Sequence, residues 1–142
     1  MTGTGGGIDQ GQLDQLFTAA LEAGIARIEK DGHFFPLVFE LRSNGVIHNV
    51  AVLDAAPISG SEGVLGRLSD LLRSRAQDGL IRAAAIVRHC TETARLFVQL
   101  RAPNYSQDVV VPFALSSEGL IRRRRRLSLG EFTSSPAENT IF

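Results

Sequence analysis

The sequence predicts an α+β protein, in which an antiparallel sheet of about five strands carries two helices packed on one face, in the order αββαβββ. Three observations support this prediction. Apolar residues recur at helical spacing in two segments, an Asn44-Gly45 pair separates two β-rich runs, and three more β-rich runs follow the second helical segment. Helices usually cover the apolar face of such a sheet. A chain of 142 residues fits one domain of common size, so we expect a single core.

The first helix is predicted from residue 9 onward. We expect residues 1–8 to be a flexible Gly-rich lead and residues 9–142 to form one α+β domain. Asp9 is the expected N-cap and Gly32 the expected stop. An apolar stripe at spacings of three and four makes this helix a core element. The stripe comprises Leu13, Leu16, Phe17, Ala20, Leu21, Gly24, Ile25 and Ile28.

The segment "HFFPLVFELRSNGVIHNVAVLD" predicts a β-hairpin. Asn-Gly is the preferred pair for a two-residue type I′ turn, because both positions need a positive φ. Such a turn places Leu41 opposite His48 on an apolar face of the sheet. The side chains expected on that face are Leu37, Phe39, Leu41, His48, Val50 and Val52. The more polar opposite face takes Val38, Glu40, Arg42, Ile47, Asn49 and Ala51.

A Pro/Gly/Ser-rich connection leads to the second predicted helix, which Ser59 or Ser61 caps and Gly79 ends. Its apolar stripe comprises Val64, Leu65, Leu68, Leu71, Leu72 and Ala76. The runs "LIRAAAIVRHC", "RLFVQLRA" and "VVVPFAL" then predict three strands. Proline cannot donate a ladder hydrogen bond, so we expect the last strand to be an edge strand or to end near Pro112.

Residues 116–142 are expected to fold back onto the domain and to supply an extra C-terminal strand. Residues 127–142 are too apolar for an ordinary disordered tail, and the last two residues are expected to end in a groove. Its apolar residues are Leu127, Leu129, Phe132, Ile141 and Phe142.

The element order over residues 9–115, with "SNG" at the first hairpin, resembles the profilin-like architecture of roadblock-type light-chain proteins. This resemblance implies a small, non-catalytic and usually dimeric partner of GTPases or motors. The stretches "FFPLVFELRSNGVI" and "VVVPF" also resemble small bacterial α+β proteins that carry a Phe-Pro strand, a Gly hairpin and a Pro-aromatic strand and have no assigned activity. Neither resemblance implies a functional residue in this chain.

No residue pattern in the sequence predicts catalysis. His89 and Cys90 are adjacent in a predicted strand, so they point to opposite faces and cannot pair as base and nucleophile. A structural role is favoured over a general base for His48, and His33 only precedes a strand. The stretch "SGSEG" at 59–63 lacks the first glycine of a nucleophile elbow and is interpreted as a helix cap. An enzymatic activity is therefore the less favoured hypothesis, and no catalytic residue is assigned.

Metal and cofactor sites are not predicted either. The chain has no paired cysteines, no His-x₃-His or His-Glu-x-x-His motif, and no dense alternation of acidic residues. The single cysteine excludes an intramolecular disulfide, which fits a reducing compartment. With no signal peptide and no long apolar run, we expect a cytoplasmic chain that does not enter a membrane.

The zero net charge conceals an uneven distribution. Residues 1–121 hold ten basic and thirteen acidic side chains, whereas residues 122–142 hold five basic and two acidic ones. The basic excess comes from five consecutive arginines, which are Arg122, Arg123, Arg124, Arg125 and Arg126. Apolar residues lie on both sides of this run, which favours an ordered segment over a free arm.

Three interpretations of the arginine run remain open. It can form a solvated edge strand, whose charges discourage pairing with another chain. It can contact nucleic acid or another polyanion. In "RRRRRLS" it can also present Ser128 to a basophilic kinase. The leading functional hypothesis is a non-catalytic protein-interaction module or homo-oligomeric scaffold, and the alternative is polyanion binding through Arg122–Arg126.

Overall fold

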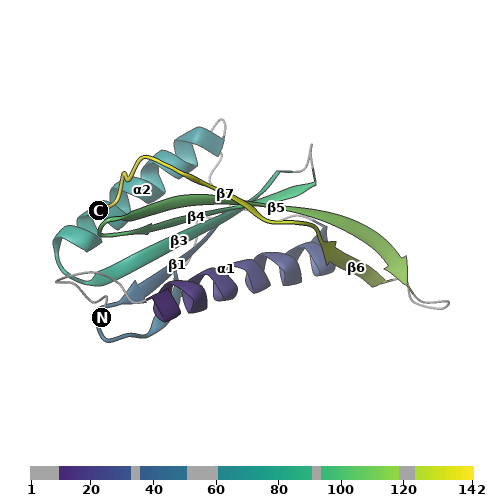
Figure 1. Ribbon diagram of the computed structural model, residues 1–142, viewed down its shortest axis with the longest axis horizontal. Helices are drawn as coiled ribbons and strands as arrows, with labels where there is room; N and C mark the ends of the chain where they lie inside the picture. The colour runs from purple at the N-terminus through teal and green to yellow at the C-terminus, as the bar shows by residue number, and fades with distance from the viewer. Residues whose placement is uncertain (1–9, 33–35, 51–60, 91–93, 119–123) are drawn as a thin grey trace.

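The computed structural model describes residues 10–32, 36–50, 61–90, 94–118 and 124–142, without the side chains of residues 31, 61–66, 90, 117, 118, 124 and 125. These residues form helices packed on an antiparallel sheet (Figure 1). The elements are α1 (Gln10–Asp31), β1 (Leu37–Arg42), β2 (Ile47–Val50), α2 (Ser61–Gln77), β3 (Ile81–Cys90), β4 (Arg95–Ala102), β5 (Tyr105–Glu118), β6 (Arg124–Leu129) and β7 (Thr133–Pro136).

The sheet has the strand order β2-β1-β3-β4-β5-β6, and β7 also pairs with β5. Every pairing between these strands is antiparallel. The α+β class, the antiparallel sheet and the predicted order of the first seven elements are confirmed. The sheet has seven strands in the described residues rather than about five, because the C-terminal segment supplies both β6 and β7.

The two helices cover opposite faces of the sheet, which corrects the expectation that both pack on one face (Figure 1). Alternate residues of a strand point to opposite faces. In β1, Leu37 and Phe39 pack with α1, whereas Val38 packs with α2. In β3, Ala85 likewise joins the α1 core and Ile86 the α2 core. The central strands are apolar on both faces, so each face needs a cover. We call these the α1 face and the α2 face.

The helix α1 has the buried stripe and the stop that the sequence predicts. Leu13, Leu16 and Ile28 are buried against the sheet. Gly32 has a φ of +83° and donates its backbone N–H to the carbonyl of Ile28. A positive φ strains residues with a Cβ, so glycine suits this C-terminal position. The predicted N-cap, Asp9, lies outside the described residues.

The helix α2 packs through three residues of its predicted stripe and exposes a fourth, while the side chains of Val64 and Leu65 lie outside the described part of the chain. Leu68 and Leu72 are buried and Ala76 is partly buried, but the side chain of Leu71 is 49 % exposed. The three packed residues recur every four positions, and Leu71 falls outside that row. Leu71 is therefore a surface residue, not a core residue.

The strand β5 continues through Pro112 rather than ending there. The backbone N–H of Phe113 bonds the carbonyl of Ala94 on one side, so the nitrogen of Pro112 faces the other side. There the pairing with β7 stops at Val110 and the pairing with β6 starts at Phe113. The proline occupies the gap between two partners, where no donor is needed.

The C-terminal segment lies against the body of the protein (Figure 1). After β7 the chain crosses to α2, where Ile141 is buried in the α2 core and Phe142 packs against it. Asn139 fixes this crossing. Its Nδ2 donates to the carbonyl of Ala102, and its Oδ1 accepts from the backbone N–H groups of Ile141 and Phe142.

Candidate functional site

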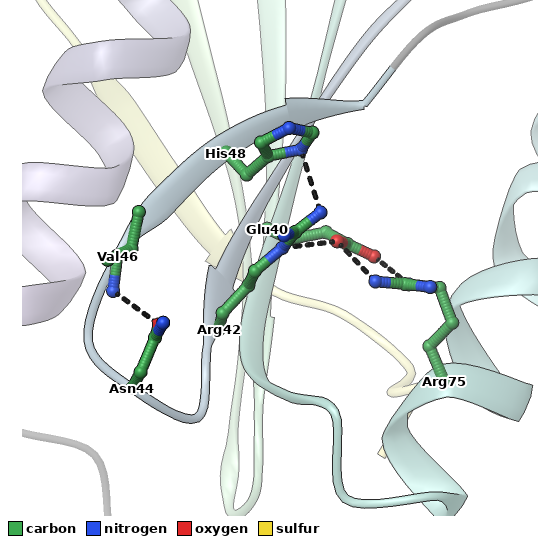
Figure 2. A network of polar contacts seen from close by, with 6 residues as sticks. All are labelled: Glu40, Arg42, Asn44, Val46, His48 and Arg75. Atoms are coloured by element: carbon green, nitrogen blue, oxygen red, sulfur yellow. Dashed lines mark hydrogen bonds and ion pairs between the residues drawn. The ribbon is translucent and has the colours of Figure 1, made fainter.

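A fully buried carboxylate lies on the α2 face of the sheet. Glu40 of β1 has no exposed side-chain surface, and Arg75 from the last turn of α2 reaches it (Figure 2). Arg75 donates from Nε to Oε2 and from Nη2 to Oε1, the second bond measuring 3.0 Å. A buried charge is tolerated only when it is paired and hydrogen-bonded, and this bidentate pair meets both conditions. The contact ties α2 to the sheet.

The ion pair between Glu40 and Arg75 makes the Arg75 guanidinium bind its proton more tightly. The hydrogen bond to Glu40 raises the pKa of the Arg75 guanidinium above its ordinary value, against the opposing effect of burial. A raised pKa in the folded state means that the stabilisation is lost only when the pH rises through that higher value. Arg75 therefore stays charged and paired across the neutral range.

A second cation and an imidazole extend this pair. Arg42, two residues after Glu40 in β1, places its Nε 3.6 Å from Oε1 of Glu40. Its Nη2 donates to Nδ1 of His48 at 3.0 Å (Figure 2). A guanidinium has no acceptor, so Nδ1 is unprotonated and the neutral imidazole carries its proton on Nε2. We call Glu40, Arg42, His48 and Arg75 the Glu40 cluster.

The β1–β2 loop brings His48 into this cluster. The backbone N–H of Arg42 bonds the carbonyl of Val46, and the N–H of Gly45 bonds the carbonyl of Arg42. Ser43, Asn44 and Gly45 thus form a three-residue loop, with Gly45 at a φ of +88°. The Asn44 side chain accepts a hydrogen bond from the N–H of Val46 (Figure 2).

The prediction of a two-residue turn is wrong, because the loop has three residues. The register pairs His48 with Glu40 rather than with Leu41. A shift of one residue moves every side chain of a strand to the other face. His48 is accordingly exposed on the α2 face. The prediction had placed it on the other face, with Leu37, Phe39 and Leu41.

The arginine run lies on a different part of the molecule. Arg124, Arg125 and Arg126 begin β6, and the exposed Arg126 is opposite Ser116 of β5. Arg122 and Arg123 lie outside the described residues. Figure 1 places β6 at the end of the sheet opposite the β1–β2 loop. The structure therefore does not bring the run together with the Glu40 cluster.

The strands β5 and β6 form a two-stranded projection that we call the arm, residues 113–118 and 124–129 (Figure 1). The pairing of β4 with β5 ends at Pro112, so beyond it β5 pairs only with β6 among the described strands. Two large apolar residues of the arm are exposed to solvent: Leu115 is 44 % and Leu129 is 41 % exposed. The α1 helix also contacts the arm, because the Glu29 carboxylate accepts a hydrogen bond from the backbone N–H of Leu127.

A shallow groove of about 560 Å³ lies between α2 and the C-terminal segment. Arg73 and Gln77 of α2, Pro103, and residues 138–142 contribute to its lining. Arg73 already donates to the Thr140 carbonyl and to the Asp70 carboxylate. These bonds attach the C-terminal segment to α2. The groove therefore lies along a contact that holds the fold together.

The other residues that the sequence singles out occupy separate places, or lie outside the part of the chain that the structure describes. The ring of His89 lies 5.5 Å from that of Phe113, measured between ring centroids. Ser128 is exposed on β6. His33, Ser59 and the Cys90 side chain are outside the described residues.

The described ranges contain neither a metal-binding cluster nor a membrane-spanning helix. Within them, no three His, Cys, Asp or Glu side chains lie close enough together to hold a metal ion. Neither described helix has the length and hydropathy that a membrane span requires.

Comparison with known proteins gives no further guide to the site, because no family model, curated protein or solved structure matches this chain.

Sequence reasoning placed Glu40 and Arg42 together on a polar strand face but missed Arg75. Its only local signal is a basic residue in the last turn of an amphipathic helix, which usually indicates favourable contact with the helix dipole. Two candidate sites therefore stand: the arm and the Glu40 cluster.

Proposed function

We propose that this chain is a non-catalytic interaction module and that the arm is its contact element. The observation that supports the proposal is the pair of exposed leucines on a two-stranded projection. A two-stranded ribbon is marginally stable alone, and its apolar face gains stability when a partner covers it. Leu115 and Leu129 lie on the same face of the arm as Phe113 and Leu127, which belong to or pack against the α1 core, yet both leucines stay exposed.

The favoured partner is a second copy of the chain. Homo-oligomers commonly use the same surface on both subunits, so one apolar patch can cover its twin. The charge distribution supports this choice, since residues 1–121 have a balance of −3 and residues 122–142 a balance of +3. Each copy offers both signs of charge to the other. The expectation of a dimer from the roadblock-like element order points the same way.

The contact is expected to use the apolar face of the arm rather than its edge. The outer edge of β6 begins with three arginines, and two such edges repel each other when paired. Two leucines that are each less than half exposed offer far less apolar surface than the roughly 800 Å² per partner of a standard stable interface. Self-association is therefore expected to depend on concentration.

Light scattering over a wide range of protein concentration tests the dimer. The mass of the wild-type chain is expected to rise toward twice the monomer mass, and the variant Leu115→Ser/Leu129→Ser is expected to remain monomeric. Leu71→Ser is the matched control, because Leu71 is similarly exposed but lies on α2. A wild-type chain that stays monomeric throughout, or a dimer that survives the double substitution, contradicts the proposal.

Polyanion binding through Arg122–Arg126 is the second candidate. The observation that favours it is that the run enters a projecting strand with Arg126 exposed. If the arm neutralises four phosphates, affinity for mixed-sequence DNA or RNA falls by about two decades between 50 and 200 mM salt. A variant with glutamine at all five positions is expected to lose this binding. Equal binding by both proteins would remove the candidate.

A further inference from the structure

Two guanidinium groups converge on one carboxylate in the Glu40 cluster. Arg75 alone satisfies Glu40, because it donates one hydrogen bond to each carboxylate oxygen. Arg42 brings a second positive charge to the same group. The cluster therefore has one positive charge more than the buried ion pair requires.

The position of Arg42 is costly without a further partner. Its Nε is buried and makes no hydrogen bond within the described part of the chain, and 3.6 Å to Oε1 of Glu40 is too long for one. An unsatisfied buried N–H and two neighbouring guanidiniums both raise the free energy of the folded state. A bound anion lowers that free energy, because it neutralises the excess charge.

Donors for such an anion remain in the cluster. The bonds of Arg42 use Nη2, and those of Arg75 use Nε and Nη2. The Nη1 groups of both arginines have no hydrogen-bond partner among the described residues. His48 adds its Nε2–H, because its Nδ1 accepts from Arg42. Figure 2 shows the side chains of Arg42, His48 and Arg75 coming from β1, β2 and α2 into one network above the buried carboxylate, with the second ring nitrogen of His48 on the outer side of its ring.

The surrounding side chains keep the donors in place and accessible. The Glu40 carboxylate fixes the Arg75 guanidinium by two hydrogen bonds, so little side-chain freedom is lost when a ligand binds. The side chains of Arg42 and Arg75 are 38 % and 30 % exposed, and His48 is exposed. A ligand can therefore reach the cluster from solvent.

We propose that Arg42, Arg75 and His48 form a binding site for an oxyanion, with Glu40 as the positioning residue beneath them. The ligand chemistry is that of a phosphate or carboxylate group, because the planar guanidinium fork matches both. The site is open, so it takes a small anion or the anionic end of a larger molecule. It lies at the opposite end of the sheet from the arm and does not depend on the proposed self-association (Figure 1).

Titration of the full chain with inorganic phosphate, and separately with citrate, tests the site and distinguishes the two chemistries. At constant pH and ionic strength, calorimetry is expected to show saturable binding, and the imidazole NMR signals of His48 are expected to shift with the same dissociation constant. Chloride added at the same ionic strength is expected to produce no saturable change. The anion that binds more tightly identifies the group that the site prefers.

Substitutions locate the binding. Arg42→Gln is expected to weaken the affinity for the preferred anion by about ten- to a hundredfold, since it removes a charge-assisted contact. Arg42→Lys, which keeps the charge but not the fork, is expected to recover part of this loss. Arg67→Gln is the matched control, because it removes one exposed positive charge from the same helix as Arg75.

Two outcomes would overturn the oxyanion site. One is equal affinity in the wild-type chain and Arg42→Gln. The other is the absence of saturable binding of either anion up to roughly 50 mM, well above the dissociation constant of a weak specific site. If Arg42→Gln fails to fold, His48→Ala replaces it in the calorimetric titration, because the exposed imidazole contributes little to the core. Unchanged affinity in His48→Ala then contradicts the site.

Discussion

At the scale of single residues, Glu40 links the sheet to α2. It is a buried acid that shares the α2 face of β1 with the apolar Val38, and it depends on Arg75 for hydrogen bonds to both of its oxygens. A buried ion pair contributes little relative to an apolar pair of the same shape, but losing one partner leaves a charge unpaired. The cluster is therefore sensitive to single substitutions.

Glu40→Gln is expected to lower the free energy of unfolding by about 2–4 kcal/mol, because it leaves two arginines beside a neutral amide. The value lies below that of a fully buried pair, since both arginines are partly exposed. Urea denaturation at neutral pH measures it. The control Asp70→Asn breaks an exposed pair with Arg73 and is expected to cost less than about 1 kcal/mol. Equal losses in the two variants would show that burial of Glu40 has no special weight.

The residues of the Glu40 cluster show what sequence reasoning can reach. Strand alternation was enough to place Glu40 and Arg42 on one face. Arg75 is 35 positions away from Glu40, and only the packing of α2 against the sheet brings it near. His48 was assigned to the wrong face because its position depends on the number of residues in the loop.

At the scale of elements, the β1–β2 hairpin shows why a correct motif can give a wrong register. Asn44-Gly45 predicted a turn, and the turn is present. The same pair also fits a three-residue loop in which glycine takes the positive φ, and sequence alone does not separate the two forms. The choice is made by packing, because this register places Ile47 against the α1 core.

The C-terminal segment contacts residues that are distant in the sequence. Its apolar side chains therefore predicted that it would be buried, but not which elements would bury it. Ile141 fills the α2 core beside Leu72 and Val38, and Asn139 closes the turn before it. The pairing of β7 with the first half of β5 leaves the second half to β6. This division of β5 is what allows the arm to project.

Ile141→Ala is expected to lower the free energy of unfolding by about 2–4 kcal/mol, as for other buried large-to-small substitutions. The thermal midpoint is expected to fall with it, which calorimetry measures. Thr140→Ala, at the exposed neighbouring position, is expected to change the free energy by less than about 0.5 kcal/mol. An Ile141→Ala chain as stable as the wild type would show that the segment contributes nothing to the core.

At the scale of the whole molecule, the two candidate sites lie at opposite ends of one sheet (Figure 1). Alternating apolar runs were sufficient to predict the class and most of the element order. The sequence does not predict the placement of the helices on opposite faces, because Val38 and Ile86 need cover on a face of the sheet that also carries polar residues such as Glu40. The arm was not predicted either. It forms because β5 extends past the last residue that pairs with β4, and this difference in strand length depends on the pairing register.

Hydrogen exchange of the arm at low and high protein concentration tests the central claim, that the arm mediates self-association, most directly. A two-stranded ribbon opens readily, and a partner that covers Leu115 and Leu129 slows that opening. The amides of residues 113–118 and 124–129 are therefore expected to exchange more slowly at high concentration, while those of α2 stay unchanged. Arm amides that exchange at the same rate at both concentrations, in a sample shown to dimerise, would contradict the account.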